Sequence, residues 1–215
     1  MPRKPPRSFE PLLEAWPAGQ PLFRVHPVLH PANEPFATDR PARFRPLRTA
    51  DGEIVPMLYG AAGEQAAIAE SVLHDLAPRG PRVVAFESLV PIGLSCLIPQ
   101  RDLQLAMLHS TGLDRLRLRN AQLIDTLPSR YPDTLPWGQA LYDHALHLDG
   151  IVWMSRRYNS VRACVLFGST TNDERVEDGD LVFDPAQSFP TLAFGDGYEL
   201  IVDACTAADV LITRP

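Results

Sequence analysis

The segment DGIVWMSRRYNSVRACVLFG, residues 149–168, decides the fold class because it holds two short apolar runs with a polar stretch between them. We predict strands over residues 151–155 and 163–167, separated by the Arg- and Asn-rich sequence. Strands that do not alternate regularly with helices favour an α+β fold over a doubly wound parallel fold. We therefore expect a compact α+β domain with mixed and antiparallel sheets and flanking helices.

Further strands and helices follow from the apolar periodicity on either side of this segment. Residues 22–26 alternate, with Phe23 and Val25 on one face and Arg24 on the other face. Pro56 makes residues 54–59 an edge or irregular strand, because proline cannot donate to a sheet ladder. Other predicted strands are 82–89, 93–98, 181–183 and 210–213, and predicted helices are 136–148 and 197–206, with 113–126 helical in part.

The clearest helix is predicted over residues 63–76. Its apolar residues recur at spacings of four and three and form one stripe, and they are Ala62, Ala66, Ala69, Leu73 and Leu76. Pro78 and Gly80 are expected to end it. Glu70 lies roughly 60–80° from the centre of the stripe, at about 100° per residue, so its side chain can point into a cleft beside the buried face.

Composition excludes several classes of protein. A chain of 215 residues with 45% hydrophobic residues can build a full core without disulfides or a structural metal. Its three cysteines are far apart and have apolar neighbours, which indicates reduced, buried thiols, and they are Cys96, Cys164 and Cys205. The net charge of −6 argues against a direct nucleic-acid ligand. No run approaches the roughly 18 apolar residues of a membrane span, so we expect a cytoplasmic protein that does not contact the membrane.

Prolines suggest how the domain is organised. Residues 1–20 are Pro-rich and are predicted to be an arm that lies on the surface or is disordered, followed by one catalytic domain over 21–215. Residues 27–56 hold six more prolines and are predicted to be a long loop interrupted by short strands. Loops of that length inside a compact domain are uncommon and often functional.

Common cofactor and metal signatures are absent from the sequence. It contains no GxGxxG, GxxxxGK[ST], HExxH or GxSxG motif, so a Rossmann-type dinucleotide enzyme is not expected. His26 and His30 flank Pro27 and do not share a helix face. His144 and His147 are three residues apart but lack a further ligand pair, which favours surface histidines over a zinc site.

Five segments in a fixed order carry the functional signal, and they are LFRVHP (22–27), ARFRP (42–46), LYGA (58–61), AIAESVLH (67–74) and DGIVWMSRR (149–157) leading into ACVLFG. Taken singly, each has an ordinary structural interpretation. Together they resemble the RES domain, a family named for its Arg, Glu and Ser and related in fold to ADP-ribosyltransferase toxins. The resemblance runs from about Leu22 to Phe167.

The resemblance implies an activity, a partner and a set of site residues. The similar branch degrades NAD by phosphorolysis or hydrolysis, with inorganic phosphate as a candidate co-substrate, and some members transfer ADP-ribose to a protein. Such toxins are encoded beside an Xre-like antitoxin that blocks the site. The implied catalytic residues are Glu70, Ser155 and Arg24, and the implied NAD-binding residues are Arg24, Arg43, Tyr59 and Ser155. NAD is then the substrate, and neither a metal nor a further cofactor is implied.

The residue types suit that chemistry. Breaking the nicotinamide–ribose bond passes through an oxocarbenium-like state, which a carboxylate such as Glu70 stabilises. Guanidinium groups of Arg24 and Arg43 match the oxygens of a pyrophosphate. Tyr59 offers a ring for stacking, and the Ser155 hydroxyl could orient Glu70 or a ribose hydroxyl.

Three hypotheses from different classes stay open at this stage. They are an NAD-consuming toxin, an ADP-ribosyltransferase that modifies a specific protein, and an inactive RES-like binding module. The joint presence of the five candidate residues argues against the last. A serine-nucleophile hydrolase is a distant fourth, because no histidine is placed by motif to activate Ser155.

Overall fold

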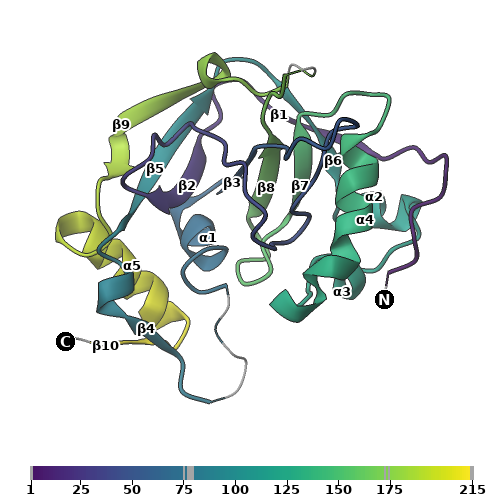
Figure 1. The fold of residues 1–215 in the computed structure, drawn as a ribbon. Helices are drawn as coiled ribbons and strands as arrows, with labels where there is room; N and C mark the ends of the chain where they lie inside the picture. The colour runs from purple at the N-terminus through teal and green to yellow at the C-terminus, as the bar shows by residue number, and fades with distance from the viewer. Residues whose placement is uncertain (1, 75, 77–79, 172, 174, 214–215) are drawn as a thin grey trace.

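The computed structural model describes residues 2–74, 76, 80–171, 173 and 175–213 and shows one large curved sheet with helices at both ends (Figure 1). The sheet has eight strands in the order β1-β6-β7-β8-β3-β2-β5-β9, and all neighbours are antiparallel except β6 and β7. In sheet order the strands are Leu13–Trp16, Leu103–Met107, Gly150–Met154, Arg162–Phe167, Met57–Ala61, Leu22–Pro27, Ile92–Pro99 and Leu181–Phe189. The α+β class is confirmed.

Short helices and a small second sheet pack around the large one. Helices α2, α3 and α4 lie together near β6 and β7, and α5 lies with the small sheet at the other end (Figure 1). The α-helices are α1 Glu64–Ala69, α2 Ser110–Arg115, α3 Asn120–Leu123, α4 Tyr131–Tyr142 and α5 Gly195–Ala207, and the small parallel sheet joins β4 Val83–Ala85 to β10 Leu211–Thr213. Single 3₁₀ turns span Phe86–Ser88, Pro128–Arg130 and Asp178–Asp180.

Strands β7 and β8 form the antiparallel pair expected from the segment 149–168. Ile151 pairs with Val165 and Trp153 with Ala163, and all four are buried. Because both faces of the sheet are covered here, the two strands are apolar almost throughout instead of alternating. Buried side chains divide into two clusters, a larger one that includes α1, α4 and α5 and a smaller one that includes Trp16, Leu22 and Val152.

The edge position predicted for residues 54–59 is wrong. Strand β3 lies inside the sheet, between β8 and β2. It begins at Met57, so Pro56 precedes the strand and removes no ladder donor, while the Pro56 carbonyl still accepts a hydrogen bond from the Gly168 N–H.

The N-terminal segment lies along the surface of the domain, with most of its residues exposed, and is attached there by one strand and a few buried contacts. Leu13–Trp16 form β1, an edge strand of the large sheet, and the Trp16 side chain is 1% exposed. Further upstream, the Trp137 indole N–H donates to the Arg3 carbonyl over 2.7 Å, and the Phe9 ring packs edge-on against Trp137. Buried aromatic contacts of this kind hold the proline-rich segment in place.

Two helices have bounds other than those predicted. Helix α1 ends at Ala69, and Glu70 is its C-cap residue. Ser71 donates its hydroxyl back to the Ala67 carbonyl, a local bond that competes with helix continuation. Leu73 is still buried, although it follows the helix, and Pro78, predicted to end it, lies outside the described residues.

Helix α4 begins five residues before the predicted start at Pro136. Its second residue is Pro132, a position where a missing N–H costs nothing, and Pro136 lies inside the helix. Among the described residues, no helix has the length and the apolar character needed to cross a membrane.

Candidate active site

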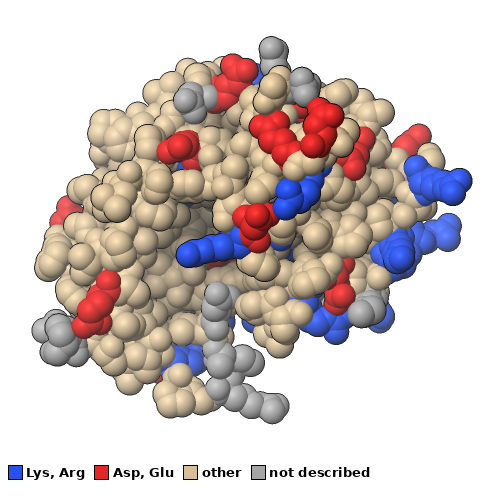
Figure 2. Space-filling view, in the orientation of Figure 1, with Lys and Arg blue, Asp and Glu red and all other residues tan. Residues whose placement is uncertain are grey.

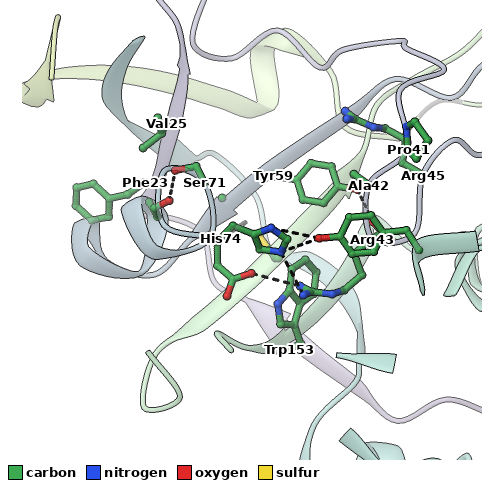
Figure 3. A pocket seen from close by; sticks show the side chains of 15 residues that line it. Phe23, Val25, Pro41, Ala42, Arg43, Arg45, Tyr59, Ser71, His74 and Trp153 are labelled. Carbon is green, nitrogen blue, oxygen red and sulfur yellow. Dashed lines mark hydrogen bonds and ion pairs between the residues drawn. The ribbon is translucent and has the colours of Figure 1, made fainter. Parts of the chain in front are cut away.

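A cavity of about 290 Å³ opens on one face of the large sheet. Its floor comes from β2 and β3, and its walls come from the end of α1, the loop around residues 41–45 and the start of α4 (Figure 3). The same face is hollowed near its centre in the space-filling view, where basic side chains project over it (Figure 2). The charged, polar and aromatic lining residues include Phe23, Arg43, Arg45, Tyr59, Glu70, Ser71, His74, Tyr131 and Trp153.

Glu70 is held at this cavity by the end of α1. Its Oε1 accepts two hydrogen bonds, from the Ser155 hydroxyl at 2.7 Å and from the Arg156 backbone N–H at 2.8 Å. Its Oε2 lies 3.3 Å from the Arg43 guanidinium. The side chain is 12% exposed, so these three donors replace most of the water around the carboxylate.

Ser155 is fully buried and follows β7 directly. Its backbone N–H donates to the Val161 carbonyl, and its hydroxyl oxygen accepts the Tyr158 N–H at 3.2 Å. These bonds fix the turn between β7 and β8, and the hydroxyl hydrogen is directed to Glu70. The Ser155–Glu70 contact suggested by the sequence is present.

Arg43 contacts the Oε2 atom of Glu70, and the Arg43 side chain is 3% exposed. Its guanidinium is 5.6 Å from the centre of the Trp153 ring and 3.4 Å from His74 Nε2 (Figure 3). Its Nε has no hydrogen-bond acceptor among the described residues. The next residue, Phe44, has φ of +68° and is fully buried, a left-handed conformation that is strained for a bulky side chain.

Tyr59 reaches into the cavity from β3. Its hydroxyl donates to the Arg43 carbonyl at 2.5 Å. Burial raises the pKa of Tyr59, so its phenol stays protonated and remains a hydrogen-bond donor. The guanidinium of Arg45 lies 5.6 Å from the ring centre, on the side of the cavity formed by Pro41 and Ala42 (Figure 3).

The cavity is also lined by residues that were not predicted from the sequence, among them His74, Tyr131 and Trp153. His74 and Trp153 stand within the quoted segments AIAESVLH and DGIVWMSRR, so their presence there was a signal. Tyr131 lies outside all of these segments, so no sequence motif indicated it. It comes from the start of α4, and its hydroxyl is 2.9 Å from His74 Nε2.

Arg24 does not line the cavity, so the structure does not bring it together with Arg43, Tyr59 and Glu70. Phe23 and Val25 line the cavity, so Arg24 points to the opposite face of β2. There its Nη1 donates to the carbonyls of Ala32 at 2.5 Å and Glu34 at 2.8 Å, and burial lowers its pKa to about 10. Arg24 therefore fastens the loop that follows β2.

His144 and His147 lie outside the cavity and contact other parts of the domain, while Cys164 is one of the residues that line the cavity. His144 Nε2 lies 3.0 Å from the Phe9 carbonyl oxygen, and His147 Nδ1 lies 3.7 Å from Asp173. Within the described parts of the chain, no three His, Cys, Asp or Glu side chains gather as a metal site would require. The three cysteines are buried and unpaired, as expected.

The arrangement favours a reaction that develops positive charge on its substrate. The Glu70 carboxylate is fixed by three donors beside aromatic side chains, in a partly enclosed space. Preorganised charge of this kind stabilises a cationic transition state without reorganisation at the moment of reaction.

Comparisons with known proteins identify a similar fold and a family. A chain in the crystal structure of the M. tuberculosis MbcT–MbcA toxin–antitoxin complex has a similar fold, with a TM-score of 0.56 and 18% sequence identity, over 79% of this chain and 82% of that chain. No curated protein matches the sequence. The sequence model of the RES domain matches residues 21–188, more than half of the chain. This protein therefore belongs to the RES domain family.

Proposed function

We propose that this protein cleaves the bond between nicotinamide and ribose in NAD. The observation that supports the proposal is the triad of Arg43, Glu70 and Ser155, in which a buried arginine and a buried serine hold one carboxylate at a cavity. As the C1′–N bond breaks, its electron pair leaves with nicotinamide, which becomes neutral, and positive charge develops on the ribose. Glu70 would stabilise that charge.

Inorganic phosphate or water then forms the new bond to C1′ and loses a proton. Phosphate would give ADP-ribose 1″-phosphate and water would give ADP-ribose. The test is to incubate the purified protein with NAD, with and without phosphate, and to separate the products. Faster NAD loss with phosphate supports phosphorolysis, whereas free ADP-ribose at a phosphate-independent rate indicates hydrolysis. A radiolabelled protein band from labelled NAD indicates ADP-ribosyl transfer, and NAD that persists unchanged refutes the proposal.

We further propose that this protein is the toxin of a toxin–antitoxin pair and acts in the cytoplasm. The similarly folded chain comes from a toxin–antitoxin complex, and an enzyme that depletes NAD must be restrained in its host. The inhibitor we expect is a helical, Xre-like protein from an adjacent gene that covers the cavity around Arg43 and Glu70. Growth arrest on expression alone, relieved by co-expression of the neighbour, is the expected result. Normal growth with active protein present would count against the toxin role.

A further inference from the structure

Three arginines of this chain are candidates to receive the phosphates of a nucleotide, and the structure separates them. Arg24 lies on the far face of β2 with its guanidinium bonded to two carbonyls. Arg43 is 3% exposed and its guanidinium contacts Glu70 and Trp153. Neither offers a free pair of donors to a ligand in the cavity.

Arg45 differs from both. It lines the cavity and is half-buried, and only its Nε is engaged, donating to the Arg40 carbonyl at 3.0 Å. Among the described residues, no carboxylate pairs with Arg45, and its Nη1 and Nη2 have no acceptor. Its guanidinium lies over the Tyr59 ring, 5.6 Å from the ring centre. Nη1 and Nη2 of Arg45 are therefore held at the cavity and available to donate hydrogen bonds to a ligand.

The two ends of the cavity are lined by different side chains. His74 and Trp153 lie toward one end, Arg45 lies with Pro41 and Ala42 at the other, and Tyr59 is between them (Figure 3). Glu70 belongs to the His74 end, because both side chains contact the Arg43 guanidinium. In a nicotinamide nucleotide, the ribose separates the scissile bond from the 5′-phosphate. A ribose that stacks on Tyr59 with its C1′ at Glu70 would direct its phosphate toward Arg45.

We propose that Arg45 is the phosphate anchor of this site and makes the protein selective for phosphorylated nicotinamide nucleotides over the bare nucleoside. This inference rests on the proposed function, because it assumes that the nicotinamide–ribose bond lies at Glu70. A guanidinium fork binds two phosphate oxygens at once, which fixes orientation as well as adding affinity. A cavity of about 290 Å³ is at the low end of small-molecule sites, so part of a dinucleotide would extend beyond it, and Arg45 lines the cavity while remaining only half-buried.

The test compares two substrates and two arginines. Cleavage of NAD and of nicotinamide riboside, which lacks phosphate, is measured for the parent protein, Arg45→Ala and Arg45→Lys. Arg40→Ala is the matched control, because Arg40 is an exposed arginine of the same loop that does not line the cavity. Binding of ADP-ribose by calorimetry is a second readout that does not depend on turnover.

For Arg45→Ala we expect KM for NAD and Kd for ADP-ribose to rise roughly tenfold or more, with kcat and riboside cleavage unchanged. Arg45→Lys should be intermediate, since it keeps the charge and loses the fork. Equal losses on both substrates, no change with either, or the same loss in Arg40→Ala would each overturn the assignment. If the parent cleaves neither substrate, the proposed NAD cleavage fails, while the ADP-ribose measurement still decides the role of Arg45.

Discussion

The hydroxyl of Ser155 donates to Glu70 Oε1 over 2.7 Å, joining two residues 85 positions apart in the chain. Ser155 directly follows a buried strand and Glu70 is the C-cap of a short helix, so each side chain is placed by the end of an element. The adjoining Arg156 N–H bonds the same oxygen. One turn of backbone therefore holds the carboxylate from one side, and Arg43 holds it from the other.

Replacing Glu70 with Gln should abolish most NAD cleavage without unfolding the protein. The amide keeps the size of the side chain but removes the negative charge that faces the reacting sugar, and loss of such stabilisation costs about 100-fold or more in kcat. Glu64→Gln is the control, because Glu64 lies in the first turn of α1 and does not line the cavity. Assays of kcat together with thermal unfolding would check this. A Glu70→Gln enzyme with parental kcat would falsify the catalytic role.

Replacing Ser155 with Ala should lower kcat by about 10- to 100-fold and leave KM for NAD nearly unchanged. The variant removes one of the donors to Glu70 and so loosens the carboxylate, and each factor of ten corresponds to about 1.4 kcal/mol. Ser71→Ala is the matched control, since Ser71 lines the cavity and its hydroxyl donates to the Ala67 carbonyl instead of to Glu70. Equal effects of the two substitutions would contradict a special role for Ser155.

Replacing Arg24 with Ala should destabilise the fold rather than weaken NAD binding. Two hydrogen bonds from a charged donor to the carbonyls of Ala32 and Glu34 are lost, each worth about 1.5–3 kcal/mol before relaxation. We expect urea denaturation to show a loss of about 2–4 kcal/mol, while KM for NAD measured well below the melting temperature stays at the parental value. A raised KM at parental stability would return Arg24 to the binding site.

His26 should make the protein less stable as pH falls through about 6.5. Burial, and then the charge of Arg24, lower the pKa of His26 below its ordinary value of 6.5. In the window between the folded and the unfolded pKa, the unfolded chain takes up a proton that the folded chain does not. The free energy of unfolding therefore decreases as pH decreases.

Urea denaturation at pH 7.5, 6.5 and 5.5 measures this slope. In His26→Gln the slope should be shallower than in the parent, whatever the absolute stability of the variant. His147→Gln, with a side chain that is 74% exposed, should keep the parental slope. Parallel slopes for all three proteins would mean that another group carries the pH dependence.

The sequence alone determined the elements whose signal is local. The β7–β8 pair, the faces of β2 and the helix near the C-terminus could be predicted, because burial imposes a periodicity on neighbouring residues. The order along the chain of the segments that contain Arg43, Glu70 and Ser155 also predicted the family. The structure brings these three side chains together.

The tertiary structure decided what depends on residues far apart in the chain. Alternation placed Arg24 opposite Phe23 and Val25, but only the assembled sheet shows which face holds the cavity. Tyr131 reaches His74 from a helix more than fifty positions later, and Trp16 is buried because β1 pairs with β6. Apolar periodicity indicates whether a residue is buried, but it does not indicate which distant residue it packs against. The site is formed by such distant residues, so only the tertiary structure could identify all of them.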